Sequence, residues 1–183
     1  DDKLTVAFVA EFSRGKSELI NAIFFADYGN RMLPSSAGRT TMCPTELLFD
    51  ASKQPCIELL PIQTRATNSG VTEYKSFPDE WTVVALDTES PDAMQDALRH
   101  VSETTRVAPE EAARLGFEVG QGEVELYRIG EDGLVEVPRW RHAMINFPHP
   151  LLKQGLVILD TPGLNAIGAE PELTLSQLPN AHA

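Results

Sequence analysis

A chain of 183 residues is long enough to bury one sizeable core, whereas two complete domains would be crowded. Its formal charge of −12 repels the phosphates of nucleic acid and anionic lipid, so we expect no nucleic-acid partner and no direct lipid contact from this segment. The apolar runs are far shorter than the roughly 20 residues that span a bilayer, and Cys43 and Cys56 lack metal-ligand spacing. Free thiols in a reducing cytoplasm are therefore expected.

The chain opens with a pattern typical of a strand, a loop and a helix. Residues 4–10 (LTVAFVA) predict a buried strand, and helical spacing follows it. Leu19, Ala22, Ile23 and Ala26 recur at i, i+3, i+4 and i+7, which predicts the buried face of that helix. Residues 4–28 thus form one unit.

The loop between the predicted strand and the predicted helix, residues 10–17 (AEFSRGKS), matches the phosphate-binding pattern G-x-x-x-x-G-K-S with alanine at its first position. Gly15 allows the backbone to curl around an oxyanion, while the helix N-terminus supplies aligned N–H groups. Lys16 can then reach the β and γ phosphates, and the Ser17 hydroxyl can ligate Mg²⁺. The alternative is an ordinary helix start with a solvated lysine; the apolar strand just before the motif favours the phosphate loop.

Residues 31–45 (RMLPSSAGRTTMCPT) have no periodicity and predict an irregular loop. A hydroxyl within residues 38–45 could complete the Mg²⁺ shell only when a γ phosphate is bound, which would make the loop a switch. A plain surface loop is the alternative.

Residues from about 50 to 140 carry no recognisable motif. Strand patterns cover residues 56–62, 71–77 and 81–86; a helix is predicted from Pro91 with Ser90 as its N-cap, and another over residues 109–115. Residues 124–129 and 134–137 flank a predicted hairpin turn, and strands are expected at 144–147 and 156–159. His142 and His149 have no partner at metal-ligand spacing, so Mg²⁺ is the only metal expected.

The last strand runs into Asp160-Thr161-Pro162-Gly163. An aspartate at the carboxyl end of a central strand can hold Mg²⁺, and Gly163 can offer its N–H to a γ phosphate. Taken alone the sequence could be a plain turn, but a phosphate loop earlier in the chain favours a second phosphate-sensing element. The order of elements predicts an α/β P-loop NTPase fold, with a mixed, mostly parallel sheet flanked by helices.

Together the segments VAEFSRGKSELINAI, TTMCPT and GLVILDTPGLN resemble the first three nucleotide motifs of bacterial dynamin-like GTPases. The resemblance implies a partial GTPase domain over residues 1–183, with a switch I loop at 31–45, an insertion at about 50–140, and the third-motif strand and switch II at 156–170. It implies Mg²⁺ held by Ser17, Thr41 and Asp160, and catalytic roles for Ser13, Lys16, Thr41 and Gly163. The phosphate-binding residues would be Glu11, Phe12, Ser13, Arg14, Gly15, Lys16, Ser17 and Glu18.

The resemblance further implies that Thr41 positions the attacking water and that Ser13 helps to hold a monovalent cation, K⁺ or Na⁺. Leu164 stands where Ras-like enzymes place a glutamine, so help is expected from the cation and from pairing of GTPase domains. The implied activity is hydrolysis of GTP to GDP, coupled in the longer protein to self-assembly and to membrane remodelling from a cytoplasmic, peripheral position.

Two other functions stay open at this point: a ribosome-assembly or translation-type GTPase, and a nucleotide-gated interaction module with little hydrolysis. The base-reading patterns N-K-x-D and T-R-x-D are absent from these residues. We therefore interpret the chain as a truncated GTPase domain, and expect it alone to be weak or inactive and to distinguish GTP from ATP poorly.

Overall fold

A computed structural model describes residues 4–9, 20–28, 43–117 and 129–161. The strands are β1 (Leu4–Val9), β2 (Thr45–Leu48), β3 (Cys56–Pro61), β4 (Thr82–Ala85), β5 (Thr104–Val107), β6 (Val135–Pro138), β7 (Trp140–Asn146) and β8 (Leu156–Thr161). Helical segments are residues 20–24, η1 (Ala26–Tyr28), η2 (Ile62–Ala66), α2 (Val71–Tyr74), η3 (Pro78–Glu80), α3 (Pro91–Leu98), η4 (Arg99–Ser102), α4 (Pro109–Arg114) and α5 (Pro150–Lys153). Among the residues described, no helix is long and apolar enough to cross a membrane.

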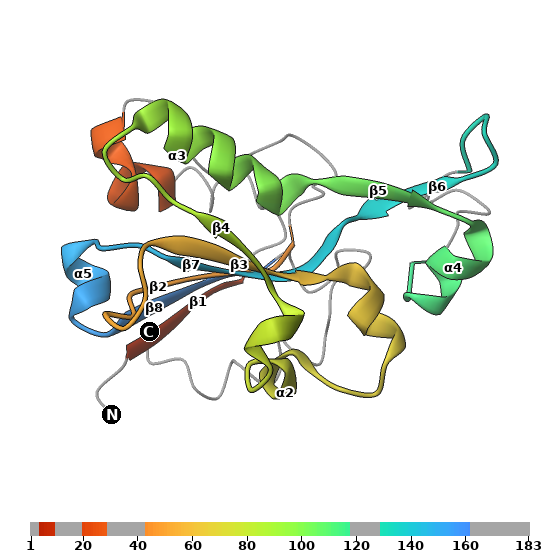
Figure 1. Ribbon diagram of the computed structural model, residues 1–183, viewed down its shortest axis with the longest axis horizontal. Coiled ribbons are helices and arrows are strands. Elements are labelled where there is room, and N and C mark those ends of the chain that lie inside the picture. Colours follow the sequence, from red (N-terminus) through yellow and green to blue (C-terminus); the bar gives the residue numbers. More distant parts are fainter. Residues whose placement is uncertain (1–3, 10–19, 29–42, 118–128, 162–183) are drawn as a thin grey trace.

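Six strands form one mixed sheet in the order β1-β8-β2-β7-β3-β4. β1 pairs with β8 in parallel, as β2 does with β7, and the other three pairings are antiparallel. Figure 1 shows α3 and the helix of residues 20–24 above this sheet and α2 below it. The α/β fold with a mixed sheet and flanking helices is therefore confirmed. The expectation that the sheet is mostly parallel is wrong for the described strands, because β2, β3 and β4 each enter an antiparallel pairing.

The main core lies on the upper face of the sheet. Cross-strand register places one apolar residue from each of five neighbouring strands in a single row: Ile158, Leu47, Ile145, Ile57 and Val84. The first four are at most 3% exposed, and all five belong to the cluster that α3 completes with Met94 and Leu98. Because residues opposite one another across strands share a face, this row fixes the register of the sheet.

The helix of residues 20–24 is present, but it buries a different face from the predicted one. Ile20, Phe24 and Phe25 are at most 5% exposed, whereas Ala22 and Ala26 are exposed and Ile23 is 42% exposed. The centroids of the Phe25 and Phe147 rings lie 5.1 Å apart. The two aromatic rings carry more apolar area than the alanines, and their packing sets the rotation of the helix.

The predicted strand at residues 71–77 is wrong, because Val71–Tyr74 form the short helix α2. One helical turn places Val71 and Tyr74 on the same side, where they pack with Leu60 and Trp81. The indole N–H of Trp81 also donates to the Tyr74 carbonyl at 2.8 Å. Tertiary packing therefore overrides the strand preference of this β-branched and aromatic sequence.

Residues 50–140 do not form a separate body. β3 and β4 extend the main sheet and α3 covers it, while β5, β6 and α4 form a smaller unit with a core of its own. The helices starting at Pro91 and Pro109 are confirmed, and the Ser90 side chain accepts a hydrogen bond from the Ala93 N–H as its cap requires. The predicted turn is present at Gly133, whose φ is +79°, and an antiparallel bridge joins Ile129 to Val135 across it. The rest of the predicted strand at 124–129 lies outside the described residues, and β6 pairs with β5. β2 and β5 are strands that the sequence patterns did not predict.

Candidate functional site

The carboxyl ends of β1 and β8 lie side by side. The parallel register pairs Phe8 with Asp160 and Val9 with Thr161. The predicted phosphate loop follows β1 directly in the sequence, and the predicted third motif begins with the last residues of β8. In α/β sheets, ligands bind beyond the carboxyl ends of parallel strands, so both motifs begin at the edge where a ligand is expected.

The predicted switch loop reaches the same edge from the opposite direction. β2 is antiparallel to β8, and its first residue, Thr45, lies opposite Asp160. The predicted loop of residues 31–45 thus joins the sheet beside the strand that carries the third motif. The three motifs are separated by up to about 145 residues of sequence, yet three consecutive strands of the sheet bring their ends together.

The entry of this loop into β2 is anchored within the core. Thr45 is fully buried and its hydroxyl donates to the Cys43 carbonyl at 2.9 Å. The Cys43 N–H donates to the Val101 carbonyl at 3.2 Å, and the Ala143 N–H donates to the Pro44 carbonyl at 3.0 Å. Among the described residues neither Cys43 nor Cys56 forms a disulfide, as predicted, and Cys43 packs in the main core. These bonds hold the junction between loop and strand rigid.

A buried ionic cluster lies on the opposite face of β2, one residue after Thr45. The Glu46 carboxylate contacts His142 Nε2 of β7 at 2.7 Å and Lys75 Nζ, just after α2, at 2.8 Å. Burial alone would raise the pKa of Glu46, but the hydrogen bonds and charges of His142 and Lys75 lower it to about 2. The carboxylate is therefore ionised and ties β2, β7 and α2 together.

The sequence reading missed this cluster because its members are far apart in the chain and none belongs to a motif. His142 is 1% exposed, and its Nδ1 is the one buried side-chain nitrogen or oxygen without a hydrogen-bond partner among the residues that the structure describes. No local signal identified it, since Glu46 directly follows a predicted loop and His142 lies before a predicted strand.

Most of the predicted site residues lie outside the described part of the chain. These are Glu11, Phe12, Ser13, Arg14, Gly15, Lys16, Ser17, Glu18, Thr41 and Gly163. For Asp160 the structure describes the backbone. Asp160 is the last residue but one of β8 and pairs with Phe8 of β1 and Thr45 of β2. The structure thus positions the ends of the strands that carry these residues.

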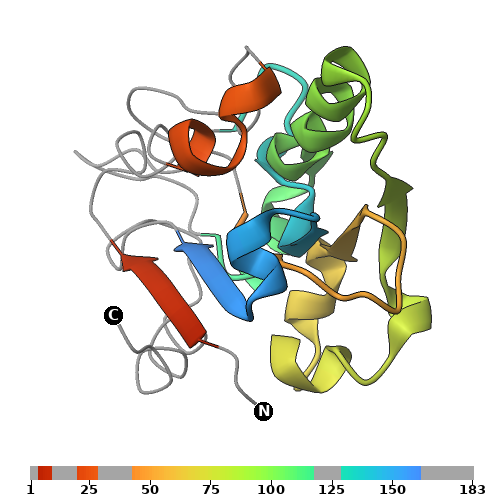
Figure 2. The same cartoon turned by 90° about the vertical axis from the view of Figure 1, so that its left-hand side faces the viewer.

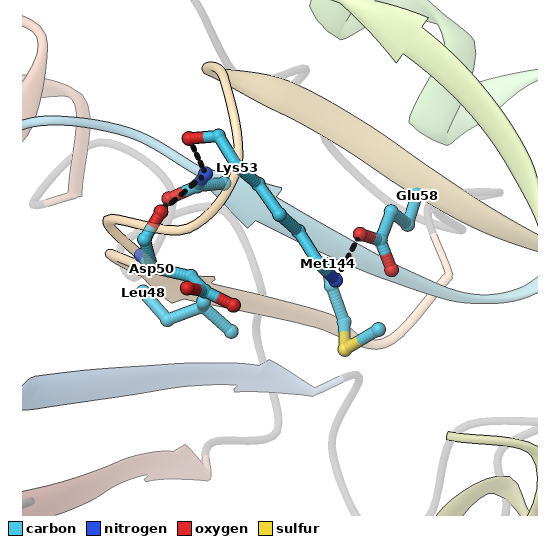
Figure 3. A pocket seen from close by; sticks show the side chains of 6 residues that line it. Leu48, Asp50, Lys53, Glu58 and Met144 are labelled. Carbon is cyan, nitrogen blue, oxygen red and sulfur yellow. Dashed lines mark hydrogen bonds and ion pairs between the residues drawn. The ribbon is translucent and has the colours of Figure 1, made fainter. Parts of the chain in front are cut away.

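A shallow pocket lies at the other end of β2, away from this edge (Figure 3). Its lining includes Leu48, Asp50, Lys53, Glu58 and Met144, with Asn146. Lys53 Nζ pairs with Glu58 at 2.7 Å, and the Asn146 amide donates to the carbonyls of residues 50, 53 and 54. Its polar groups are thus engaged in holding the turn between β2 and β3, and we assign it no ligand.

The comparisons with known proteins match nearly the whole chain. A family model described as Dynamin family matches residues 6–183. "Bacterial dynamin-like protein" of Nostoc punctiforme is 25% identical over 179 residues, which cover 96% of this chain and 19% of that protein. A solved structure described as an oligomerised bacterial dynamin pair, with a mechanism for long-range sensing and tethering of membranes, covers 99% of this chain and 19% of its own, at 17% identity and a TM-score of 0.40. The chain spans about a fifth of the length of these relatives.

Proposed function

The chain belongs to the dynamin family, and on that premise we propose that the protein of which it is part binds GTP with Mg²⁺ and hydrolyses it to GDP and phosphate. The observation that carries the proposal is the register of β1, β8 and β2, which aligns Phe8, Asp160 and Thr45 across three neighbouring strands. One edge of the sheet thereby receives the ends of all three nucleotide motifs. The family match also favours this function over a ribosome-assembly or translation-type GTPase.

The phosphates bind in the loop of residues 11–18. Backbone N–H groups around Gly15 donate to the phosphate oxygens, and Lys16 donates to the β and γ phosphates. These donors act on charge that builds between the β and γ phosphates as the bond breaks. Ser13 contributes by holding a monovalent cation near the same oxygens.

The residues assigned to Mg²⁺ fit that ion by the chemistry of their donors. Ser17 and Thr41 offer hydroxyl oxygens and Asp160 a carboxylate, and Mg²⁺ prefers such hard oxygen ligands. The strand end of Asp160 lies at the edge where the phosphate loop begins. When bound, Mg²⁺ neutralises charge on the β and γ phosphates.

Thr41 and Gly163 sense the γ phosphate. Thr41 precedes the anchored junction of Cys43 and Thr45 by only a few residues, so ordering of the loop around a triphosphate has a fixed point from which to start. Thr41 then orients the attacking water, and the Gly163 N–H donates to the γ phosphate. Loss of that phosphate releases both contacts.

For the longer protein we propose assembly through pairing of its GTPase domains and a peripheral position at the cytoplasmic side of a membrane. The match to the dynamin family and the similarity to a bacterial dynamin-like protein support this proposal. The acidic charge of this segment places any lipid contact in other regions of the protein.

The test is GTP turnover by the full-length protein with Mg²⁺, with and without a chelator. Asp160→Asn should reduce turnover at least about a hundredfold, a loss of roughly 3 kcal/mol of transition-state stabilisation. Asp132→Asn is the matched control, because Asp132 lies at the β-hairpin turn and pairs with Arg106. Wild-type turnover that resists the chelator would contradict the proposal. A single-turnover assay showing tight GTP binding without hydrolysis would instead favour the nucleotide-gated interaction module.

A further inference from the structure

We propose that the free edge of β4 is a docking site for an extended segment of a partner protein, with an apolar centre and basic ends, which adds a strand to the sheet. β4 is the last strand of the sheet in the described part of the chain, at the edge opposite β1. Figure 2 shows the two edges on opposite sides of the molecule, β1 on the left and β4 at the right-hand border. β7 and β3 separate β4 from β2, the nearest strand of the proposed nucleotide site, so the docking site lies away from the nucleotide site.

The register identifies which backbone groups the edge offers. The Leu86 N–H donates to the Pro55 carbonyl at 3.0 Å, and the pairing of β3 with β4 places Val84 opposite Ile57. In an antiparallel ladder, residues alternate between bonding to the neighbour and pointing away from it. Since Leu86 and Val84 bond to β3, the N–H and carbonyl groups of Val83 and Ala85 point outward from the sheet.

β4 is only four residues long and its flanks are acidic, and both features discourage pairing with another acidic chain, but its own residues lack the other features that protect an edge. Residues 82–85 (TVVA) contain no charge and no proline, and their pairing with β3 has no bulge. Thr82, Val83 and Ala85 are exposed, and Val83, at 60%, is the most exposed large hydrophobic residue described. An added strand would cover the Val83 side chain as well as satisfy the two outward residues.

Acidic residues flank β4 at both ends and favour a partner segment with basic ends. Asp79 and Glu80 precede the strand and Asp87 and Glu89 follow it, and all four are exposed. None of them forms an ion pair within the part of the chain that the structure describes. The nearby lysines are engaged elsewhere, Lys75 with Glu46 and Lys53 with Glu58.

A second copy of this chain is therefore a poor occupant. Two-fold antiparallel pairing of β4 with β4 would bring the acidic start of each strand to the acidic end of the other, and like charges in that arrangement repel. A segment with lysine or arginine at both ends and β-branched residues between them complements the edge in charge and in shape.

The first experiment titrates the full-length protein with a synthetic peptide of alternating valine and threonine, with lysines at both ends. Ala85→Pro removes an outward N–H without breaking a bond to β3, and the extended Val84 before it suits a following proline. It should weaken binding at least about tenfold, as loss of one backbone hydrogen bond predicts. Ala51→Pro, which introduces the same residue in the exposed turn between β2 and β3 and outside β4, is the matched control. Because Ala85→Pro leaves every charge in place, equal binding by this variant would mean non-specific electrostatic attraction and would overturn the proposal.

A second experiment alters only the peptide, so that folding of the variant is not at issue. N-methylation of alternate residues in one phase should abolish binding to the wild-type protein, and methylation in the other phase should leave it unchanged. A peptide with glutamates in place of the lysines should bind at least about tenfold more weakly. Equal effects of the two methylation phases, equal binding of the two charge types, or a self-associated protein that Ala85→Pro dissociates would each overturn the proposal.

Discussion

Thr45 lies opposite Asp160 in the antiparallel pairing of β2 with β8, and Phe8 lies opposite Asp160 on the other side. Neighbouring strands are about 4.8 Å apart, so the end of the switch loop, the third motif and the start of the phosphate loop meet within about two strand spacings. The buried row beneath them, including Leu47 and Ile158, holds this alignment. A phosphate group bound here would lie beside the described ends of β1, β8 and β2.

Thr41→Ala should slow GTP hydrolysis by the full-length protein much more than it weakens GDP binding. The Thr41 hydroxyl is proposed to meet Mg²⁺ and water only in the triphosphate state, so its loss raises the barrier without affecting the product complex. Turnover and GDP affinity measured side by side check this. Thr40→Ala is the matched control, and equal losses of GDP and GTP affinity in Thr41→Ala would make Thr41 a structural residue.

Hydrolysis should run faster in K⁺ or Na⁺ than in a large organic cation at matched ionic strength. A cation held with the help of Ser13 would offset charge that develops between the β and γ phosphates. Ser13→Ala should remove this difference between salts. If the wild-type rate is the same in all salts, Arg14 or an external group supplies the positive charge instead.

Glu46→Gln should lower the free energy of unfolding by about 3–5 kcal/mol, because it leaves His142 and Lys75 without their buried counter-charge. Glu58→Gln is the matched control, since its partner Lys53 is half exposed and such pairs contribute about 1 kcal/mol or less. Denaturant titration of both variants in the full-length protein measures the difference. Similar losses in both variants would show that the buried cluster has no special role in stability.

The same cluster should produce an acid-sensitive stability. The pKa of Glu46 falls from 4.5 to about 2 on folding, so the stabilisation is fully present above pH 4.5 and is lost as the pH falls toward 2. The shift corresponds to about 3 kcal/mol. Denaturation midpoints measured through this range should fall more steeply for the wild type than for Glu46→Gln. Parallel curves for the two proteins would contradict the assignment.

Local sequence patterns were sufficient to predict several elements of the fold. The apolar runs at residues 4–10 and 156–159 and the cap at Ser90 predicted β1, β8 and α3, because each signal lies within one element. The helix face at residues 20–26 and the helix at Val71–Tyr74 were predicted wrongly, since partners distant in sequence decide them. Phe147 selects the aromatic face in the first case, and Trp81 with Leu60 selects a helical turn in the second.

The candidate site likewise has one part that local sequence predicts and another part that depends on the assembled sheet. The residues that bind phosphate and Mg²⁺ are proposed from contiguous motifs, whereas the alignment of Phe8, Asp160 and Thr45 depends on strand order. The contact between Glu46 and His142 joins residues 96 positions apart, which no local pattern encodes. Strand order and buried charge pairs are properties of the assembled sheet.

The most direct test of a GTP site at this edge is calorimetric titration of GTP, with Mg²⁺, into the full-length protein and its Lys16→Ala variant. Lys16→Ala should abolish measurable GTP binding with the thermal unfolding transition unchanged, because it removes a charge aimed at the β and γ phosphates. Lys53→Ala is the control, since Lys53 pairs with Glu58 at the other end of β2, and it should bind GTP like the wild type. Unchanged GTP affinity in folded Lys16→Ala protein would contradict the site.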